Sequence, residues 1–293
     1  MGGPATAQTG WLQDFVDFVQ SSGAPCDFIS THLYPTDPNV PQTRDGFAQT
    51  IAAAAAIAQS IHKPLTVTEF NAGLGIDAAD GPYASAFVIH QLASFINVSN
   101  VDTLSFWTFS DIFEEQGFIS APYSQQFGMK NIYNVPKPVY RAFQMVSDLN
   151  TFVLDGSLSV TQVTSSGNVD AILANRAVSG GIFYMALTTN FDVRASNVTV
   201  SESVTVVFNV PSGTPPSVAQ IELIDATHAY AKPLWVAAGS PTYPSTAQVQ
   251  SELDASVLVA NTIALTSRGG NNYAVTLQLG PYAVARIYFV VTQ

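Results

Sequence analysis

The sequence predicts two parts of different fold class: a parallel α/β unit of the kind found in (β/α)8 barrels, followed by an antiparallel β-sandwich. In the first half of the 293 residues, strand-length apolar segments alternate with helices, a pattern that produces parallel βα units. In the second half, short β-branched runs recur between turn residues and helical periodicity nearly disappears. The change falls near Asn150, so we predict a partial barrel domain over 1–149 and a sandwich domain over 150–293.

Hydrophobic periodicity places the elements of the first part. Between Trp11 and Gln20 the apolar residues recur at spacings of three and four, which predicts an amphipathic helix that ends at Gly23. The run from Leu65 to Phe70 has the length and composition of a strand. On the same grounds we expect further strands over 26–34 and 103–109 and further helices over 47–61, 83–95 and 139–149, which together make about four βα units.

The second part is expected to consist almost entirely of strands separated by Gly-, Asn- and Ser-rich turns. Its only helical signal is a short turn near 246–253. The strands are expected over 157–163, 170–175, 181–188, 198–208, 219–225, 234–236, 256–264, 273–279 and 283–291.

Composition excludes several classes of protein. An apolar fraction of 47% excludes intrinsic disorder, and a net charge of -11 argues against nucleic-acid binding, which needs a basic patch. No apolar run reaches the length of a membrane-spanning helix. Cys26 is the only cysteine, so no internal disulfide framework and no Cys-rich metal site is expected. Low charge, many Thr, Ser, Asn and Gly residues and 11% aromatics favour a soluble protein that handles neutral polar ligands, and no cofactor is implied.

Glu69 is the first candidate for chemistry. It is the only glutamate in the first 113 residues, and it stands at the end of an apolar strand. Catalytic groups of parallel α/β barrels lie at the carboxyl ends of strands. Glu69 is therefore either a carboxylate nucleophile that attacks the anomeric carbon of a sugar or a surface glutamate at a strand-to-loop turn.

Polar residues also mark the ends of the two neighbouring strands. His32 and Tyr34 are two residues apart, so we expect both on one side of their strand, where a tyrosine hydroxyl can orient a carboxylate and a histidine can bind a sugar hydroxyl. The alternative is that both are core residues. A metal site of His32 and Asp37 is disfavoured, because no second histidine stands at ligand spacing.

A second group of residues is proposed to bind the sugar. Trp107 offers a face for stacking on a pyranose ring, unless it is a core tryptophan. An acidic loop after it is expected to accept hydrogen bonds from sugar hydroxyls, unless it is simply solvated. The substrate-binding candidates are His32, Asn71, Trp107, Asp111, Glu114 and Glu115.

In sequence order, several segments resemble glycoside hydrolase family 39, which contains β-xylosidases and α-L-iduronidases. The resemblance covers nearly the whole chain, because the segment 279–287 also looks like the end of that family's C-terminal domain. The segments of the first part that carry it are Gly-Gly-Pro-Ala (2–5), Asp-Phe-Ile-Ser-Thr-His-Leu-Tyr (27–34), Val-Thr-Glu-Phe-Asn (67–71), Phe-Trp-Thr-Phe-Ser-Asp-Ile-Phe-Glu-Glu (106–115), Phe-Gly-Met (127–129) and Pro-Lys-Pro-Val-Tyr-Arg-Ala-Phe (136–143).

The resemblance implies a retaining glycosidase on a (β/α)8 barrel. Glu69 matches the family's nucleophile and Tyr34 its hydrogen-bonding partner, while His32, Trp107 and the Glu114/Glu115 pair match positions that line the sugar subsite. The match does not select the sugar.

The resemblance also implies that the chain holds strands five to eight only. In the family, the Gly-Gly-Pro segment belongs to strand five, and the Asn-Glu pair that supplies the acid/base precedes it. No Asn-Glu dipeptide occurs in this sequence, so we expect catalysis to be impaired. The open edges of a half barrel would be covered by a second copy, by the sandwich, or by the remainder of a longer protein.

Two functional hypotheses follow, and a third is weaker. The chain is a family-39-type, β-xylosidase-like glycosidase or part of one, or it is a non-catalytic carbohydrate-binding, lectin-like protein derived from such an enzyme. The third hypothesis is a secreted interaction protein that acts through its sandwich. The glycosylation patterns at Asn97 and Asn197 favour secretion, although the sequence carries no signal peptide.

Overall fold

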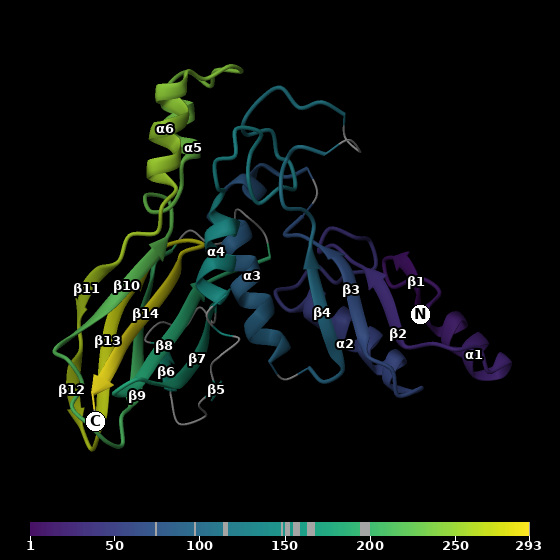
Figure 1. Ribbon diagram of the computed structural model, residues 1–293, viewed down its shortest axis with the longest axis horizontal. Coiled ribbons are helices and arrows are strands. Elements are labelled where there is room, and N and C mark those ends of the chain that lie inside the picture. The colour runs from purple at the N-terminus through teal and green to yellow at the C-terminus, as the bar shows by residue number, and fades with distance from the viewer. Residues whose placement is uncertain are drawn as a thin grey trace.

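The computed structural model describes residues 1–73, 75–96, 98–113, 117–147, 149, 153–154, 159–162, 168–193 and 200–292. A four-stranded sheet with its helices forms one part of the molecule, and two antiparallel sheets form the other (Figure 1). Helices α3 (Pro82–Phe95) and α4 (Pro138–Ser147) lie between the two parts. No helix in the described ranges has the length and apolarity needed to cross a membrane.

The first part is an incomplete (β/α)8-type barrel of four βα units. All its strands run parallel, in the order β1-β2-β3-β4. The strands are β1 (Gly2–Ala7), β2 (Phe28–His32), β3 (Leu65–Phe70) and β4 (Val101–Phe106). The helices are α1 (Leu12–Ser22), α2 (Gly46–Gln59), α3 (Pro82–Phe95) and α4 (Pro138–Ser147), and the short 3-10 helix η1 (Asp77–Asp80) precedes α3.

Side-chain alternation gives the parallel sheet two unlike faces. Leu65 and Val67 of β3 are fully buried in the core that the helices form. Successive residues of a strand point to opposite faces, so Thr66 and Thr68 point away from the helices, and both are only half-buried. The face that closes inward in a complete barrel therefore carries hydroxyl groups on β3 rather than the aliphatic side chains of its helix-covered face.

The second part is an antiparallel β-sandwich. One sheet has the order β11-β10-β14-β8-β7-β5, and the other has the order β12-β13-β9-β6. Inward-facing residues from both sheets, among them Val206, Phe208, Ile287 and Phe289, form its core. The strands are β5 (Val153–Leu154), β6 (Ser159–Gln162), β7 (Val169–Val178), β8 (Gly181–Asn190), β9 (Glu202–Asn209), β10 (Val218–Ile224), β11 (Asn261–Ala264), β12 (Thr266–Gly269), β13 (Asn272–Leu279) and β14 (Val284–Thr292).

Two expectations for the second part are wrong. The strand expected over 234–236 is helix α5 (Lys232–Ala237), which begins with a proline in its first turn, where the missing N–H costs nothing. The short turn near 246–253 is a full helix, α6 (Thr246–Ala255). Ser245 and Gln248 form a capping box at its start, and a capping box supplies partners for two free backbone N–H groups.

Helices α5 and α6 stand above the sandwich beside the loops of the barrel part (Figure 1). The Tyr123 hydroxyl in one such loop donates to Glu252 Oε2 in α6 at 3.1 Å, and both residues are buried. Tyr123 also packs on Trp235 of α5, with ring centroids 5.4 Å apart. Burial raises the pKa of Glu252. The helices thus bind the sandwich to the loop that follows β4.

A second contact joins the two parts through polar side chains. Asp170 of β7 accepts a hydrogen bond from Arg44 and lies 2.9 Å from Nδ1 of the fully buried His90 in α3. Arg44 also donates to the backbone carbonyl of Phe191 at 3.0 Å, and the Phe191 ring stacks on His90 at 4.8 Å. Because Asp170 binds the side chains of both Arg44 and His90 from the barrel part, this contact fixes the position of the sandwich relative to α3.

Replacing Asp170 with Asn is expected to lower the free energy of unfolding by about 2–4 kcal/mol, because the amide keeps an acceptor oxygen but removes the carboxylate charge that pairs with the Arg44 guanidinium. Urea denaturation of the two proteins measures the difference. The matched control is Asp102→Asn at an exposed position of β4, which should change stability by no more than about 0.5 kcal/mol. Equal effects of the two substitutions would contradict this role for Asp170.

Candidate active site

The register of the parallel strands brings the candidate residues together. His32 at the end of β2 lies opposite Glu69 near the end of β3, and Phe70 lies opposite Phe106 at the end of β4. Between Thr31 and His32 the pairing skips one residue of β3, a bulge that changes the direction of the side chains after it. The carboxyl ends of three strands therefore meet around Glu69.

Glu69 is held by Tyr34. The Tyr34 hydroxyl donates to Glu69 Oε2 at 2.7 Å, although Tyr34 lies two residues beyond the end of β2. The backbone of the same segment is fixed on both sides, because Leu33 N donates to Glu69 O at 3.2 Å and Tyr34 N donates to Asp37 Oδ2 at 2.8 Å. Asp37, considered above as a metal ligand, is thus a partner of the Tyr34 backbone.

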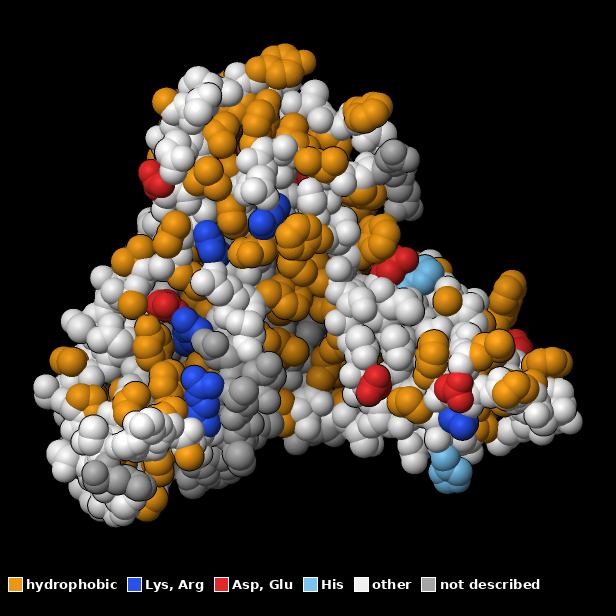
Figure 2. Space-filling view, in the orientation of Figure 1, with side chains coloured by type: hydrophobic (Ala, Val, Ile, Leu, Met, Phe, Trp, Pro, Cys, Tyr) orange, Lys and Arg blue, Asp and Glu red, His pale blue; other side chains and the backbone are white. Residues whose placement is uncertain are grey.

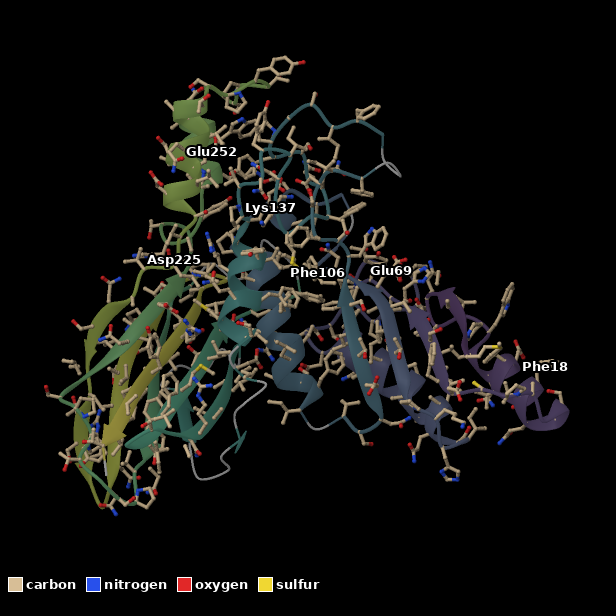
Figure 3. The ribbon with its side chains drawn as sticks, in the orientation of Figure 1. Phe18, Glu69, Phe106, Lys137, Asp225 and Glu252 are labelled. Atoms are coloured by element: carbon tan, nitrogen blue, oxygen red, sulfur yellow. The ribbon has the colours of Figure 1, made fainter. Side chains whose placement is uncertain are left out.

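Trp107 follows β4 directly and completes the group. The backbone N–H of Trp107 donates to Phe70 O at 2.8 Å, so the Trp107 backbone lies beside the residue that follows Glu69. The half-buried indole packs edge-on against Phe113, with ring centroids 6.1 Å apart. Glu69, Tyr34, His32 and Trp107 therefore come from three adjacent strand ends. Figure 3 shows Glu69 at the same edge of the parallel sheet as Phe106.

Asn71 contributes differently from the expectation that it binds sugar. Its side chain is 1% exposed, and its amide donates to the backbone carbonyls of Trp107 and of Phe127, the latter at 3.0 Å. Its Oδ1 accepts from Ala72 N at 2.6 Å. Both donor hydrogens are therefore used to hold the chain on either side of the loop that follows β4.

Asp111 fits neither the expected binding of sugar hydroxyls nor the alternative of a solvated acidic loop. It is 2% exposed, and its Oδ1 accepts from Gly128 N at 2.7 Å, while its Oδ2 lies 2.8 Å from the Lys137 ammonium. Burial raises the pKa of the Asp111 carboxyl to about 6, against the opposing effect of Lys137. A carboxylate engaged in this way holds the loop together rather than binding a sugar.

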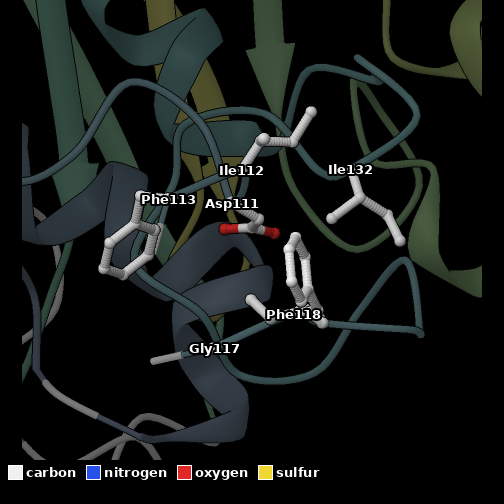
Figure 4. A pocket seen from close by; sticks show the side chains of 7 residues that line it. Asp111, Ile112, Phe113, Gly117, Phe118 and Ile132 are labelled. Carbon is white, nitrogen blue, oxygen red and sulfur yellow. The ribbon is translucent and has the colours of Figure 1, made fainter. Parts of the chain in front are cut away.

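A pocket of about 630 Å³ lies in the loops above β4 (Figure 4). Hydrophobic side chains gather over these loops in the space-filling view (Figure 2), and Ile112 and Phe118 are among the exposed ones. Phe113 both lines the pocket and packs on Trp107, so the pocket adjoins the strand ends. Its lining consists of Asp111, Ile112, Phe113, Gly117, Phe118, Ile119 and Ile132.

Several sequence-based candidates lie outside the described residues. These are the substrate-binding candidates Glu114 and Glu115 and the glycosylation candidates Asn97 and Asn197. In the part of the chain that the structure describes, no cluster of three or more His, Cys, Asp or Glu is arranged to hold a metal ion.

The structure adds residues that the sequence analysis did not single out. Lys137 is fully buried, 2.7 Å from Asp80, which is also fully buried. Gly128 passes so close to Asp111 that a side chain there would clash with the Asp111 backbone. In the sequence, the segments 127–129 and 136–143 stood out only as family motifs. The one feature that could have pointed to Lys137 is its position between two prolines in the second segment.

Comparison with known proteins gives the chain a family. Residues 1–272 match the family described as Glycosyl hydrolases family 39. A β-xylosidase of Caldicellulosiruptor saccharolyticus is 30% identical over 98% of this chain. The structure of a family-39 (GH39) enzyme from Xanthomonas axonopodis pv. citri superposes on 100% of this chain with a TM-score of 0.75 and 19% sequence identity. The structure of a monomeric β-xylosidase from Caulobacter crescentus CB15 superposes on 99% of this chain with a TM-score of 0.70 and 19% sequence identity.

The chain spans only part of these proteins: 59% of the Caldicellulosiruptor enzyme, 60% of the Xanthomonas enzyme and 61% of the Caulobacter enzyme. The two structural likenesses establish the fold, since both fall at 19% identity.

The raised pKa of Asp111 predicts how stability changes with pH. Between its ordinary pKa of 3.8 and about 6, the folded protein holds a proton that the unfolded chain has lost, so stability falls as pH rises through this window. From about pH 4 to pH 7, we expect wild type to lose about 2 kcal/mol of unfolding free energy relative to Asp111→Asn. Chemical denaturation across this pH range measures the difference in unfolding free energy between the two proteins. The control Asp102→Asn is expected to show the same pH dependence as wild type. Parallel profiles for wild type and Asp111→Asn would contradict the buried environment of Asp111.

Proposed function

The chain belongs to glycosyl hydrolases family 39, and from that membership and the Tyr34–Glu69 pair we propose that it carries the nucleophile half of a retaining β-xylosidase-like active site. Glu69 is the nucleophile, Tyr34 orients it, and His32 and Trp107 bind the sugar. The observation that supports this most strongly is the hydrogen bond from the Tyr34 hydroxyl to Glu69 at the carboxyl end of a barrel strand.

The proposed reaction begins with attack of Glu69 on the anomeric carbon. Tyr34 occupies Oε2, which leaves Oε1 to form the bond to the sugar while the glycosidic bond breaks and its electron pair leaves with the aglycone oxygen. Water then cleaves the glycosyl–Glu69 ester and restores the carboxylate, so the anomeric configuration is retained.

The second carboxyl group of a retaining glycosidase protonates the leaving group from about 5–5.5 Å away. The family's Asn-Glu pair has no counterpart in this sequence, so we assign the acid/base to no residue of this chain. Without it, only glycosides whose aglycone leaves unassisted should react at a useful rate, because general acid catalysis contributes about 10²–10⁴-fold.

The substrate proposed is a β-xyloside. The similar Caldicellulosiruptor protein is described as a β-xylosidase, and a stacking tryptophan beside a histidine and a tyrosine suits an uncharged pyranose. The apolar pocket next to Trp107 would take an aromatic leaving group.

The direct test uses an aryl β-xyloside with a good leaving group, whose hydrolysis is followed by release of the phenolate. Glu69→Gln is expected to abolish turnover. Tyr34→Phe should lower kcat/KM about 10–100-fold, the value of a hydrogen bond to a charged group. The control is Glu222→Gln in the sandwich, which should leave turnover unchanged.

Each outcome of this experiment decides between hypotheses. Turnover that survives Glu69→Gln would contradict the assignment of the nucleophile. Xyloside binding without turnover in wild type, measured by calorimetry, would favour the non-catalytic carbohydrate-binding hypothesis. Neither binding nor turnover would contradict the proposed substrate class.

A further inference from the structure

Four charged side chains of alternating sign run through the region where the sandwich helices meet the barrel loops. They are Lys232 of α5, Asp80 of η1, Lys137 before α4 and Asp111 after β4. Lys232 Nζ is 3.6 Å from Asp80 Oδ2, Lys137 Nζ is 2.7 Å from Asp80 Oδ1, and Lys137 Nζ is 2.8 Å from Asp111 Oδ2. We call these four residues the charge row.

The charge row is buried at its centre. The side chains of Asp80 and Lys137 are both completely buried, and that of Asp111 is 1% exposed. A buried ion costs free energy unless it is paired and hydrogen-bonded. Two positive and two negative charges balance, and Lys137 also donates to the backbone carbonyl of Gln126 at 3.0 Å. The arrangement pairs these ions, although Asp80 Oδ1 and Asp111 Oδ2 accept no hydrogen bond from the described residues. It brings no evident advantage in stability over an apolar core of the same volume, which raises the question of what it holds in place.

Lys137 connects the loops after the two strands that carry the candidate catalytic and sugar-stacking residues. Asp80 belongs to the loop after β3, the strand of Glu69, and Asp111 belongs to the loop after β4, which begins at Trp107. The second oxygen of Asp80 accepts from Gln125 N at 3.0 Å, so Asp80 also contacts the β4 loop directly.

The β4 loop is stiffened at the point where Lys137 holds it. Its outgoing arm, 108–111, pairs with its returning arm, 127–130, through the backbone bonds Thr108 N to Phe127 O at 3.0 Å, Met129 N to Thr108 O at 2.8 Å and Asp111 N to Lys130 O at 2.9 Å. Lys137 contacts both arms, because its ammonium meets Asp111 and Gln126 while its backbone N–H donates to Met129 O at 2.8 Å.

We propose that Lys137 is a positioning residue that fixes Trp107 relative to Glu69 by clamping the β4 loop to the β3 loop through Asp111 and Asp80. This proposal rests on the proposed function, in which Glu69 and Trp107 face the same sugar. Lys137 itself does not touch the sugar. Lys232, which also pairs with Asp77 at 2.5 Å, extends the clamp to the sandwich, so the second domain steadies the site from outside.

An ion pair that only stabilises the fold would behave differently. Glu222 and Arg286 form such a pair, with Arg286 Nη2 2.5 Å from Glu222 Oε2 across the adjacent strands β10 and β14. Breaking that pair should lower stability without altering Trp107. Arg286→Met is therefore the matched control for Lys137→Met, because each removes one cation from a mostly buried pair.

The test is a double-mutant cycle of Lys137 and Trp107 in the full chain, with the affinity for an aryl β-xyloside measured by calorimetry. Lys137→Met and Trp107→Phe are each expected to weaken binding about tenfold. If Lys137 acts by placing Trp107, the double variant should bind no more weakly than Trp107→Phe alone. Losses that multiply, or an effect of Arg286→Met equal to that of Lys137→Met, would overturn the proposal.

A second readout does not depend on sugar binding. The background for this measurement is a protein in which the other two tryptophans, Trp11 and Trp235, are replaced with Phe, so that all tryptophan fluorescence comes from Trp107. In this background, acrylamide should quench the Trp107 fluorescence at least about twofold more strongly after Lys137→Met. Arg286→Met should not increase the quenching. If wild type binds no xyloside, the proposed function fails while this quenching result still decides the role of Lys137. Unchanged quenching would overturn it.

Removing Lys137 alone leaves buried Asp111 without its cation and buried Asp80 with only Lys232 at 3.6 Å, which threatens folding. The second variant is therefore Lys137→Met with Asp80→Asn and Asp111→Asn, which removes one positive and two negative charges from the buried centre. It should fold, as circular dichroism reports, and should still show the increased quenching of Trp107. A folded triple variant with the quenching of wild type would overturn the proposal.

Discussion

The parallel pairing of β2, β3 and β4 is the constraint on which the rest of the site depends. Parallel strands end at the same edge of a sheet, and the register here sets His32 opposite Glu69 and Phe70 opposite Phe106. The bulge in β3 comes immediately before Glu69. A slip of one residue in this pairing would move every side chain to the other face, so the site exists only in this register.

Beyond the strand ends, backbone bonds pair the two arms of the β4 loop, and side chains hold the loops to one another. Asn71 uses its amide on two carbonyls of the β4 loop, and Lys137 joins that loop to the one after β3. The sandwich adds Lys232 and the Tyr123–Glu252 contact from outside. Under this proposal, the position of Trp107 depends on contacts from both domains. The second domain thus contributes to the site on the first.

Features that depend on neighbouring residues could be predicted from the sequence, whereas features that depend on contacts between distant residues could not. The strand at 65–70 and its lone glutamate were predictable, because alternation of burial and a single acidic residue at a strand end are visible within a few residues. The parts played by Asn71 and Asp111 were not, because their partners Phe127 and Lys137 lie 56 and 26 residues further along the chain. Helix α5 was missed because its apolar residues resemble a short strand when its proline start is overlooked.

Glu69 as the nucleophile is tested most directly by trapping. A 2-deoxy-2-fluoro-β-xyloside with a dinitrophenolate leaving group needs no acid assistance for its first step, and the fluorine slows release of the sugar from the enzyme. Peptide mapping by mass spectrometry should find one fluoroxylosyl group per chain, attached to Glu69. Attachment to another residue, or release of dinitrophenolate with no adduct on Glu69, would contradict the nucleophile that the geometry around Tyr34 supports.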